Sequence, residues 1–263
     1  MKVKKDLSMI ALIFFVTRCF YNLYTFTNLI SFLTISGITL VLLIIIKKIK
    51  GNLQNIKLFQ FLYVLSLIAI FITILINTTK FININYFKYY NYFVVTLSLL
   101  IISYIIGKDE IKTIASISEV FLMVFVIISV LISVGLISLI KIGNYHDFID
   151  INSISINLLP VSIIIVLFYL KENNIMTGYI LGNLSALFDT ILIIGCLGSR
   201  LTKTYSYPAI AILKSITFFN FINHLDQLFS FIYLFEYTIT LALIINILKD
   251  ILKKRTTLFS KLP

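Results

Sequence analysis

The sequence predicts an all-α integral membrane protein, a polytopic bundle of about eight transmembrane helices. Three observations predict this fold class. Hydrophobic residues make up 60% of the 263 residues, charged residues only 13%, and the mean hydropathy is +1.04, whereas a soluble domain has about 25% charged residues. The apolar runs are continuous and about 20 residues long, which is the length that crosses hydrocarbon. A β-barrel would instead alternate polar and apolar residues over about ten positions.

Lysines and polar residues separate the first four predicted spans. A lysine-rich start precedes the first apolar run, and no small-residue cleavage site follows it, so we expect an uncleaved span rather than a removed signal peptide. Lys47, Lys48 and Lys50 end the second run, and Lys108 and Lys112 follow the fourth. These limits predict spans at residues 8–26, 29–46, 57–77 and 90–107.

The second half of the chain predicts four more spans, at residues 116–140, 155–170, 177–198 and 225–248. The sixth of the eight is short and ends before Lys171. Between the last two, Pro208 stands at a plausible first helical position of an apolar stretch that is too short to span. We therefore predict a helix at the outer interface over residues 208–222. Residues 1–263 form a single transmembrane domain in this interpretation.

The distribution of basic residues predicts the orientation. Eight spans place both termini on one side, and the net charge is +11. The side of the termini holds 15 of the basic residues: Lys2, Lys4, Lys5, Lys47, Lys48, Lys50, Lys57, Lys108, Lys112, Lys171, Lys249, Lys253, Lys254, Arg255 and Lys261. The other side holds six: Lys80, Lys88, Lys141, Arg200, Lys203 and Lys214. The positive-inside rule then puts both termini in the cytoplasm of a multi-pass membrane protein.

Several functional classes find no support in the sequence. Cys19 and Cys196 lie in apolar runs, and His146 and His224 are far apart, so neither a disulfide framework nor a metal site is predicted. The bases lie in short loops without an aromatic-rich groove, so the lipid bilayer and not nucleic acid is the expected partner. No nucleotide-binding or hydrolase motif occurs. We predict no enzyme, no catalytic residues and no cofactor.

Five charged residues fall inside or at the ends of the predicted spans: Arg18, Glu119, Asp189, Asp226 and Glu236. Charge in hydrocarbon is costly, so such groups usually face protein or water. Arg18, Asp189 and Glu236 are deepest, and either an ion or substrate path or an ion pair that only fixes packing would explain them. Glu119 and Asp226 lie near span ends, where snorkelling is the simpler explanation.

Two weaker patterns accompany these charges. Asn22 and Thr25 make one end of the first span polar, which would suit either a lined cavity or an interfacial helix end. Gly178 and Gly182 are four residues apart, and Ala186 extends the pattern. Small residues at this spacing predict a close helix-packing face in a membrane.

Three blocks follow one another along the chain: Ile114 to Glu119, then Asn157-Leu158-Leu159-Pro160-Val161, then a block that contains Tyr207-Pro208, His224 and Asp226. In this order they resemble the endospore germination permeases, the B-type subunits of spore germinant receptors in the amino acid–polyamine–cation transporter superfamily. The last block is similar to the family's Pro-led helix, charged motif and following hydrophobic helix. The family's Glu-Arg pair is Asn223-His224 here, and its arginine before the fifth span is Ser116.

The resemblance implies a partial permease-like bundle, shortened in the sixth span and lacking the family's last two spans. It also implies A-type and C-type receptor subunits as partners and an amino acid or other small nutrient as ligand, in the cell membrane or the spore inner membrane. The superfamily binds substrate where spans one and six break. Pro160 stands at the start of the sixth span, whereas the first span has neither Gly nor Pro.

Three functional hypotheses follow. The first is a membrane subunit that senses or passes a small nutrient, as the resemblance implies. The second is a proton-coupled amino acid transporter that uses Asp189 or Glu236 as the proton carrier. The third is a reduced membrane interaction protein without transport activity. In the first two, the expected path residues are Arg18, Asn22, Thr25, Pro160, Asp189 and Glu236.

Overall fold

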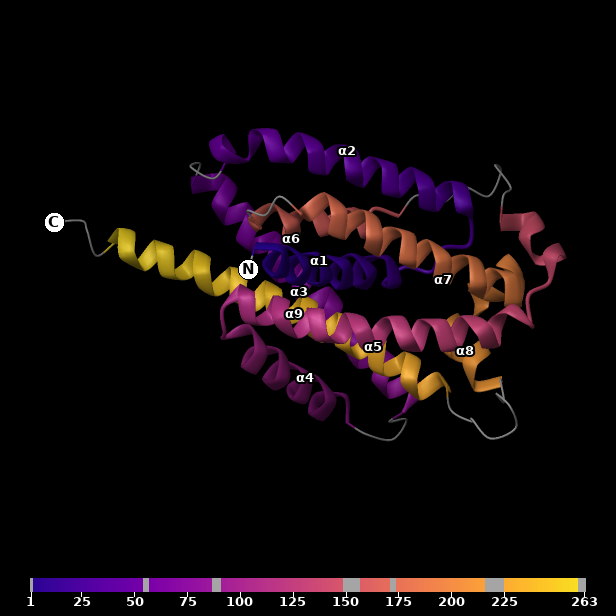
Figure 1. Cartoon of the computed structure of the whole chain (residues 1–263). Helices are drawn as coiled ribbons and strands as arrows, with labels where there is room; N and C mark the ends of the chain where they lie inside the picture. The colour runs from indigo at the N-terminus through magenta and orange to yellow at the C-terminus, as the bar shows by residue number, and fades with distance from the viewer. Residues whose placement is uncertain are drawn as a thin grey trace.

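The computed structural model describes residues 2–53, 57–86, 91–148, 157–170, 174–215 and 225–259. Every regular element in these ranges is a helix, so the predicted all-α class is confirmed for the part of the chain that is described. The long helices run side by side in one elongated bundle (Figure 1).

The helices follow the predicted spans in order. They are α1 (Lys2–Asn22), α2 (Leu29–Leu53), α3 (Lys57–Asn85), α4 (Tyr92–Gly107), α5 (Ile111–Ile137), the 3-10 helices η1 (Ile142–Phe148) and η3 (Pro160–Ser162), α6 (Ile163–Tyr169), α7 (Ile175–Thr204), α8 (Pro208–Ser215) and α9 (Leu225–Phe259).

Five helices are long and apolar enough to cross a membrane. Their apolar stretches are Leu29–Lys48, Phe59–Asn85, Ile111–Ile137, Ile175–Thr204 and Asp226–Lys253. Three shorter apolar helices cover Leu7–Asn22, Tyr92–Gly107 and Pro160–Tyr169. A helix rises about 1.5 Å per residue, so the last of these covers only about half of a 30 Å hydrocarbon core. Eight complete spans therefore remain a prediction.

The outer helices expose apolar stripes of the kind that lipid covers. On α5, exposed side chains recur every three or four residues: Val120, Met123, Ile127, Val130, Val134 and Ile137, each at least 55% exposed. A soluble monomer rarely shows a continuous apolar patch of this extent. The described chain is therefore a helical protein, and several of its helices have the length and the apolar surface that cross a membrane.

The helices α1 and α9 form the centre of the bundle. Most side chains from Met9 to Tyr21 of α1 are buried, and 67% of the apolar stretch of α9 is buried against 17–28% in the other four long helices. The helix α1 packs against α5, α7 and α9. Because these central helices are shielded from lipid, they can hold polar side chains that a lipid-facing helix could not.

The bundle has two distinct ends. At the first, which we call the basic end, Lys108, Lys112, Lys249 and Lys253 are exposed, and Lys249 Nζ donates to the carbonyl of Lys108 at 2.5 Å. The basic end lies at the left of Figure 1, where α1 begins and α9 extends beyond the other helices. The opposite end of the bundle holds the C-terminal end of α1 at Asn22 together with η1, α8 and the end of α7.

The first predicted span, 8–26, extends four residues beyond the helix. The helix α1 ends at Asn22, and residues 25–28 have no regular structure. Asn28 Oδ1 accepts from the backbone N–H groups of Ile30 and Ser31 at 2.8 and 3.1 Å, which caps α2. The polar end of this span is thus a helix cap and a connecting segment, because Asn and Thr side chains compete for backbone partners in a helix.

The sixth predicted span, 155–170, is helical only from Pro160 onward in its described residues. Asn157 Oδ1 accepts from Leu159 N–H at 2.9 Å, and Pro160 follows as the first residue of η3. An Asn-centred turn before a Pro at the first helical position fixes this start. Residues 155 and 156 lie outside the described ranges.

The predicted end of the seventh span, at residue 198, coincides with a kink in α7. Gly198 has φ 78° and ψ 157°, a conformation that favours glycine, and α7 continues beyond it to Thr204. The side chain of Asn144 in η1 donates to the carbonyl of Gly195 at 2.8 Å, and Tyr145 Oη donates to that of Ile191 at 3.2 Å. The segment η1 therefore supplies donors to the α7 carbonyls beside the kink.

The predicted interfacial helix 208–222 is described only as α8, over Pro208–Ser215. Four of its apolar side chains are buried, namely Ala209, Ile210, Ile212 and Leu213, and α8 packs against α7 and α9. Its apolar face thus covers the end of the bundle and is not left for lipid. Residues 216–222 of the prediction lie outside the described ranges.

Candidate functional site

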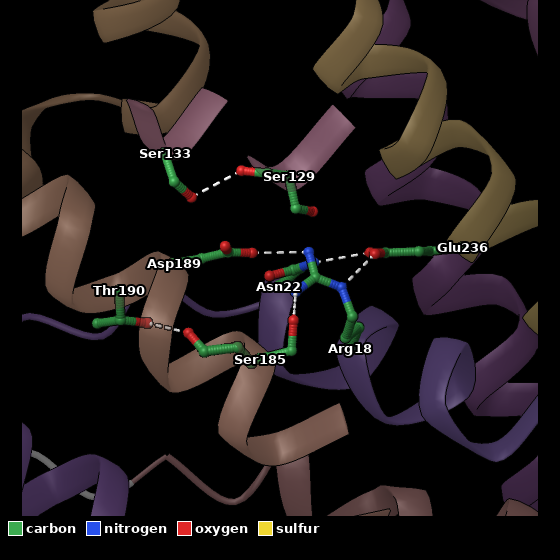
Figure 2. Close-up of polar contacts among 9 residues, drawn as sticks. Arg18, Asn22, Ser129, Ser133, Ser185, Asp189, Thr190 and Glu236 are labelled. Atoms are coloured by element: carbon green, nitrogen blue, oxygen red, sulfur yellow. Dashed lines mark hydrogen bonds and ion pairs between the residues drawn. The ribbon is translucent and has the colours of Figure 1, made fainter. Parts of the chain in front are cut away.

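A cluster of three charged side chains joins the central helices α1 and α9 to the flanking helix α7. Arg18 of α1 is fully buried. Its Nε lies 2.5 Å from Glu236 Oε1 of α9, and its Nη2 lies 2.7 Å from Asp189 Oδ2 of α7. Its Nη1 donates to Ser185 Oγ at 2.7 Å. Figure 2 shows Asp189 and Glu236 reaching the guanidinium from opposite sides. The three deepest charges predicted from the sequence thus meet in one site.

The two carboxylates have different surroundings. Glu236 is fully buried, and its second oxygen accepts from Asn22 Nδ2 at 2.7 Å. Both Glu236 oxygens are therefore occupied. The side chain of Asp189 is 18% exposed. With all three groups ionised, one positive charge faces two negative charges, and the cluster has a formal charge of −1.

Aromatic rings complete the surroundings of Arg18. Its Cζ lies 4.5 Å from the ring centroid of Phe125 in α5 and 5.9 Å from that of Phe14 in α1. These distances are within the range of a cation–π interaction. The rings also exclude water from one side of the guanidinium, which strengthens its attraction to the carboxylates.

Close packing of α1 on α7 brings Arg18 to Asp189. A Cβ added at Gly178 would lie 2.7 Å from Ile13 Cβ, and one added at Gly182 would lie 2.7 Å from both Phe14 O and Thr17 Cβ. The helices can approach this closely only because both positions lack a side chain, as the small-residue pattern predicted. Arg18 then lies beside Ser185 and Asp189, the next positions on the same side of α7.

A cavity of about 50 Å³ opens beside Asp189. One water molecule needs roughly 10–15 Å³ of such a cavity, so the cavity has room for a few waters or a small solute. It is lined by the end of α1 and the segment after it, the second half of α7, the start of α8, and α9: Tyr21, Asn22, Tyr24, Thr25, Phe26, Ala186, Asp189, Thr190, Ile193, Thr202, Ser206, Tyr207, Pro208, Ala209, Ile210 and Tyr233. We call the end of the bundle where it opens the cavity end.

Most of the predicted path residues meet at this site. Asn22, Thr25 and Asp189 line the cavity, and Arg18 and Glu236 lie directly behind Asp189. Pro160 is buried at the start of η3 and is not among the lining residues. Pro160 begins a helix here, and the fixed geometry of its ring explains this position.

The residues chosen from the family blocks have separate places. Tyr207 and Pro208 line the cavity. Burial raises the pKa of Tyr207 to about 12, so its hydroxyl remains neutral. This hydroxyl donates to the carbonyl of Asn77 at 3.4 Å. Asn157 makes the turn described above, and Glu119 is half-buried on α5 and is not among the partners of Arg18. Asp226 is buried in the first turn of α9. His224 lies outside the described residues.

Sequence reasoning found Asn22 and Thr25 but missed several other neutral members of the site. Ser185 and Phe125 contact Arg18, and Tyr21 and Tyr233 line the cavity. In a chain with 23 Phe and 15 Tyr, no aromatic residue stands out by type. One signal was present for Ser185: it lies four residues before Asp189 and three after Gly182, on the predicted packing side of its helix.

The fold and the buried site define a class, a helical membrane protein with a charged centre beside a small polar cavity. The chain gave no match to a protein-family model, to a curated protein or to a solved structure. The class therefore depends on the residues and their geometry.

Proposed function

We propose that this chain is a multi-pass membrane subunit that senses or passes a small nutrient, and that the nutrient binds in the cavity beside Asp189. The observation that supports the proposal most is the half-open charge cluster. Arg18 and Glu236 are fully buried, whereas Asp189 keeps part of its carboxylate exposed to the cavity, and acids of membrane bundles that face a cavity typically mark a substrate or ion path.

The resemblance to B-type germinant-receptor subunits makes the proposal specific. In that setting the ligand is an amino acid or another small nutrient, and the partners are an A-type membrane subunit and a C-type lipoprotein, in the cell membrane or the spore inner membrane. The permease-like bundle and the eight spans belong to this proposal. So does the orientation, with the basic end in the cytoplasm and the cavity end outside, as the positive-inside rule predicts.

A second candidate is proton-coupled transport of an amino acid, and the contact between Arg18 and Asp189 favours it. An acid that shares an arginine with a second, buried acid can exchange a proton with a water-filled cavity and change the charge of the site. Intramembrane acids of this kind are typical of proton relays. In this alternative Asp189 carries the proton, and Glu236 keeps Arg18 in place.

The substitution Asp189→Asn tests the nutrient-sensing proposal. When this substitution is made in the chromosomal gene of a spore-forming host, the spores should germinate more slowly on at least one nutrient. The reason is that the side chain at the cavity loses its charge while keeping its shape. Germination would be measured on single amino acids and sugars. Asp109→Asn is the matched control, since Asp109 is exposed at the basic end, and its spores should germinate normally.

Three outcomes separate the candidates. Slower germination together with co-purification of A-type and C-type subunits supports the sensing subunit. Uptake of a labelled amino acid into proteoliposomes along a proton gradient, lost in Asp189→Asn, supports transport. If both assays respond identically for Asp189→Asn and Asp109→Asn, both candidates fail and the interaction protein without transport activity is left.

A further inference from the structure

The Asp189 carboxylate brings the uncompensated negative charge of the cluster to the cavity. Glu236 has both oxygens occupied, by Arg18 and Asn22. Asp189 uses Oδ2 for Arg18, and among the described residues no partner is recorded for its Oδ1. In Figure 2 this second oxygen points away from the guanidinium. The uncompensated charge of the cluster is therefore available on the side of the cavity.

Among the described residues that line the cavity, no lysine, arginine or histidine offsets this charge. Asp189 supplies the one carboxylate of this lining, and the remaining polar groups are hydroxyls and the Asn22 amide. An anionic ligand would meet the Asp189 carboxylate there without a positive partner of its own among the described lining residues. A cationic group would instead form a charge-assisted hydrogen bond with Asp189.

Five of the sixteen residues that line the cavity are aromatic. These are Tyr21, Tyr24, Phe26, Tyr207 and Tyr233. A hard metal ion is best held by several carboxylate or carbonyl oxygens, and Asp189 is the one carboxylate among the described lining residues. An organic ammonium fits this lining better, since its N–H groups can donate to a carboxylate and to hydroxyls while its carbon atoms pack on rings that also attract positive charge.

We propose that the cavity binds a small organic ammonium group, with its nitrogen at Asp189 Oδ1 and its carbon atoms against the aromatic lining. The inference rests on the proposed function, because it places the ligand in the same cavity. It deepens that function by assigning the ligand class: a small amine, or the amino end of a larger nutrient, and not a carboxylate or phosphate.

The test uses the purified full chain in detergent and methylammonium chloride as the probe. Thermal unfolding would be followed by far-UV circular dichroism, since the chain has no Trp. The midpoint should rise with methylammonium concentration and level off, as expected for a ligand that binds the folded state. Sodium chloride at the same concentrations should give a smaller and non-saturating change.

Two variants and one control decide the assignment. Asp189→Asn should weaken methylammonium binding by about tenfold or more, the loss of one charge-assisted hydrogen bond, while Asp109→Asn keeps the response of the native chain. Thr190→Leu fills part of the cavity and leaves the three charged groups unchanged, so it should also abolish the response. If Asp189→Asn fails to fold, the response of Thr190→Leu to methylammonium decides whether the cavity binds this ligand.

The proposal is overturned if the native chain responds equally to methylammonium and sodium, or if Asp189→Asn or Thr190→Leu keeps the full response. This failure is distinct from failure of the proposed function. A chain that ignores methylammonium but whose Asp189→Asn variant slows germination would bind a nutrient of another class. A chain that binds methylammonium without any germination or uptake phenotype would have the site without the proposed function.

Discussion

Replacing Arg18 by methionine should lower the free energy of unfolding by about 3–5 kcal/mol, the cost of removing one partner from a buried ion pair. Methionine has a similar length and is apolar, so packing against Phe14 and Phe125 is largely retained. The loss is electrostatic, because Glu236 is fully buried and would be left with Asn22 as its remaining partner. Asp189 would then add a second negative charge to the same centre.

Denaturant unfolding of the purified protein in detergent measures this effect. Arg200→Met is the matched control, since Arg200 is exposed near the end of α7 and an exposed charge contributes roughly 0–1 kcal/mol. The triple variant Arg18→Met, Asp189→Asn, Glu236→Gln should recover part of the loss, because no charge remains unpaired. If Arg18→Met is no more destabilising than Arg200→Met, the cluster does not have the buried geometry described above.

Substituting leucine for Gly182 should destabilise the chain by about 1–3 kcal/mol, the usual cost of overpacking a tight contact. A Cβ at this position already lies 2.7 Å from the Phe14 carbonyl oxygen and from Thr17 Cβ, so α1 and α7 must move apart. The same movement would draw Arg18 away from Ser185 and Asp189. We therefore expect Gly182→Leu to weaken methylammonium binding as well as stability.

Gly37→Leu provides the control for a glycine in a helix. A Cβ at Gly37 meets nothing within 4 Å, and leucine has a helix propensity better than that of glycine by up to about 1 kcal/mol. This variant should be as stable as the native chain or slightly more stable. Equal destabilisation of both variants would show that the α1–α7 contact is not the close one described.

The sequence predicted the helices well wherever hydrophobic length decides the structure. The spans at 29–46, 57–77, 116–140, 177–198 and 225–248 each fall on a helix that can cross a membrane, because a continuous apolar run has few other stable states in lipid. Element ends were less accurate. The first predicted span continued to residue 26, whereas α1 ends at Asn22 and Asn28 caps the start of α2, and capping depends on local hydrogen bonds that hydropathy does not register.

The candidate site was predictable in its charges and not in its lining. Arg18, Asp189 and Glu236 could be chosen because charge is rare and costly in an apolar span, and the meeting of Arg18 with Asp189 follows from the Gly178–Gly182 face of α7. Tyr21 and Tyr233 could not be chosen, since their position depends on how three helices converge. For α8 the sequence suits two places, since a short apolar helix can lie on a membrane or cover a bundle end. Its described part packs against α7 and α9, and its position at the outer interface stays a prediction.

The central proposal is that the cavity lined by Asp189 opens on the outer face of a membrane-crossing bundle. Cysteine labelling on intact cells tests it most directly, in a chain whose Cys19 and Cys196 are replaced by serine. Ser206→Cys, exposed at the cavity end, should react with a membrane-impermeant maleimide added outside, and Thr113→Cys, exposed at the basic end, should react only after the cells are permeabilised. Labelling of Thr113→Cys and not of Ser206→Cys from outside would contradict the account.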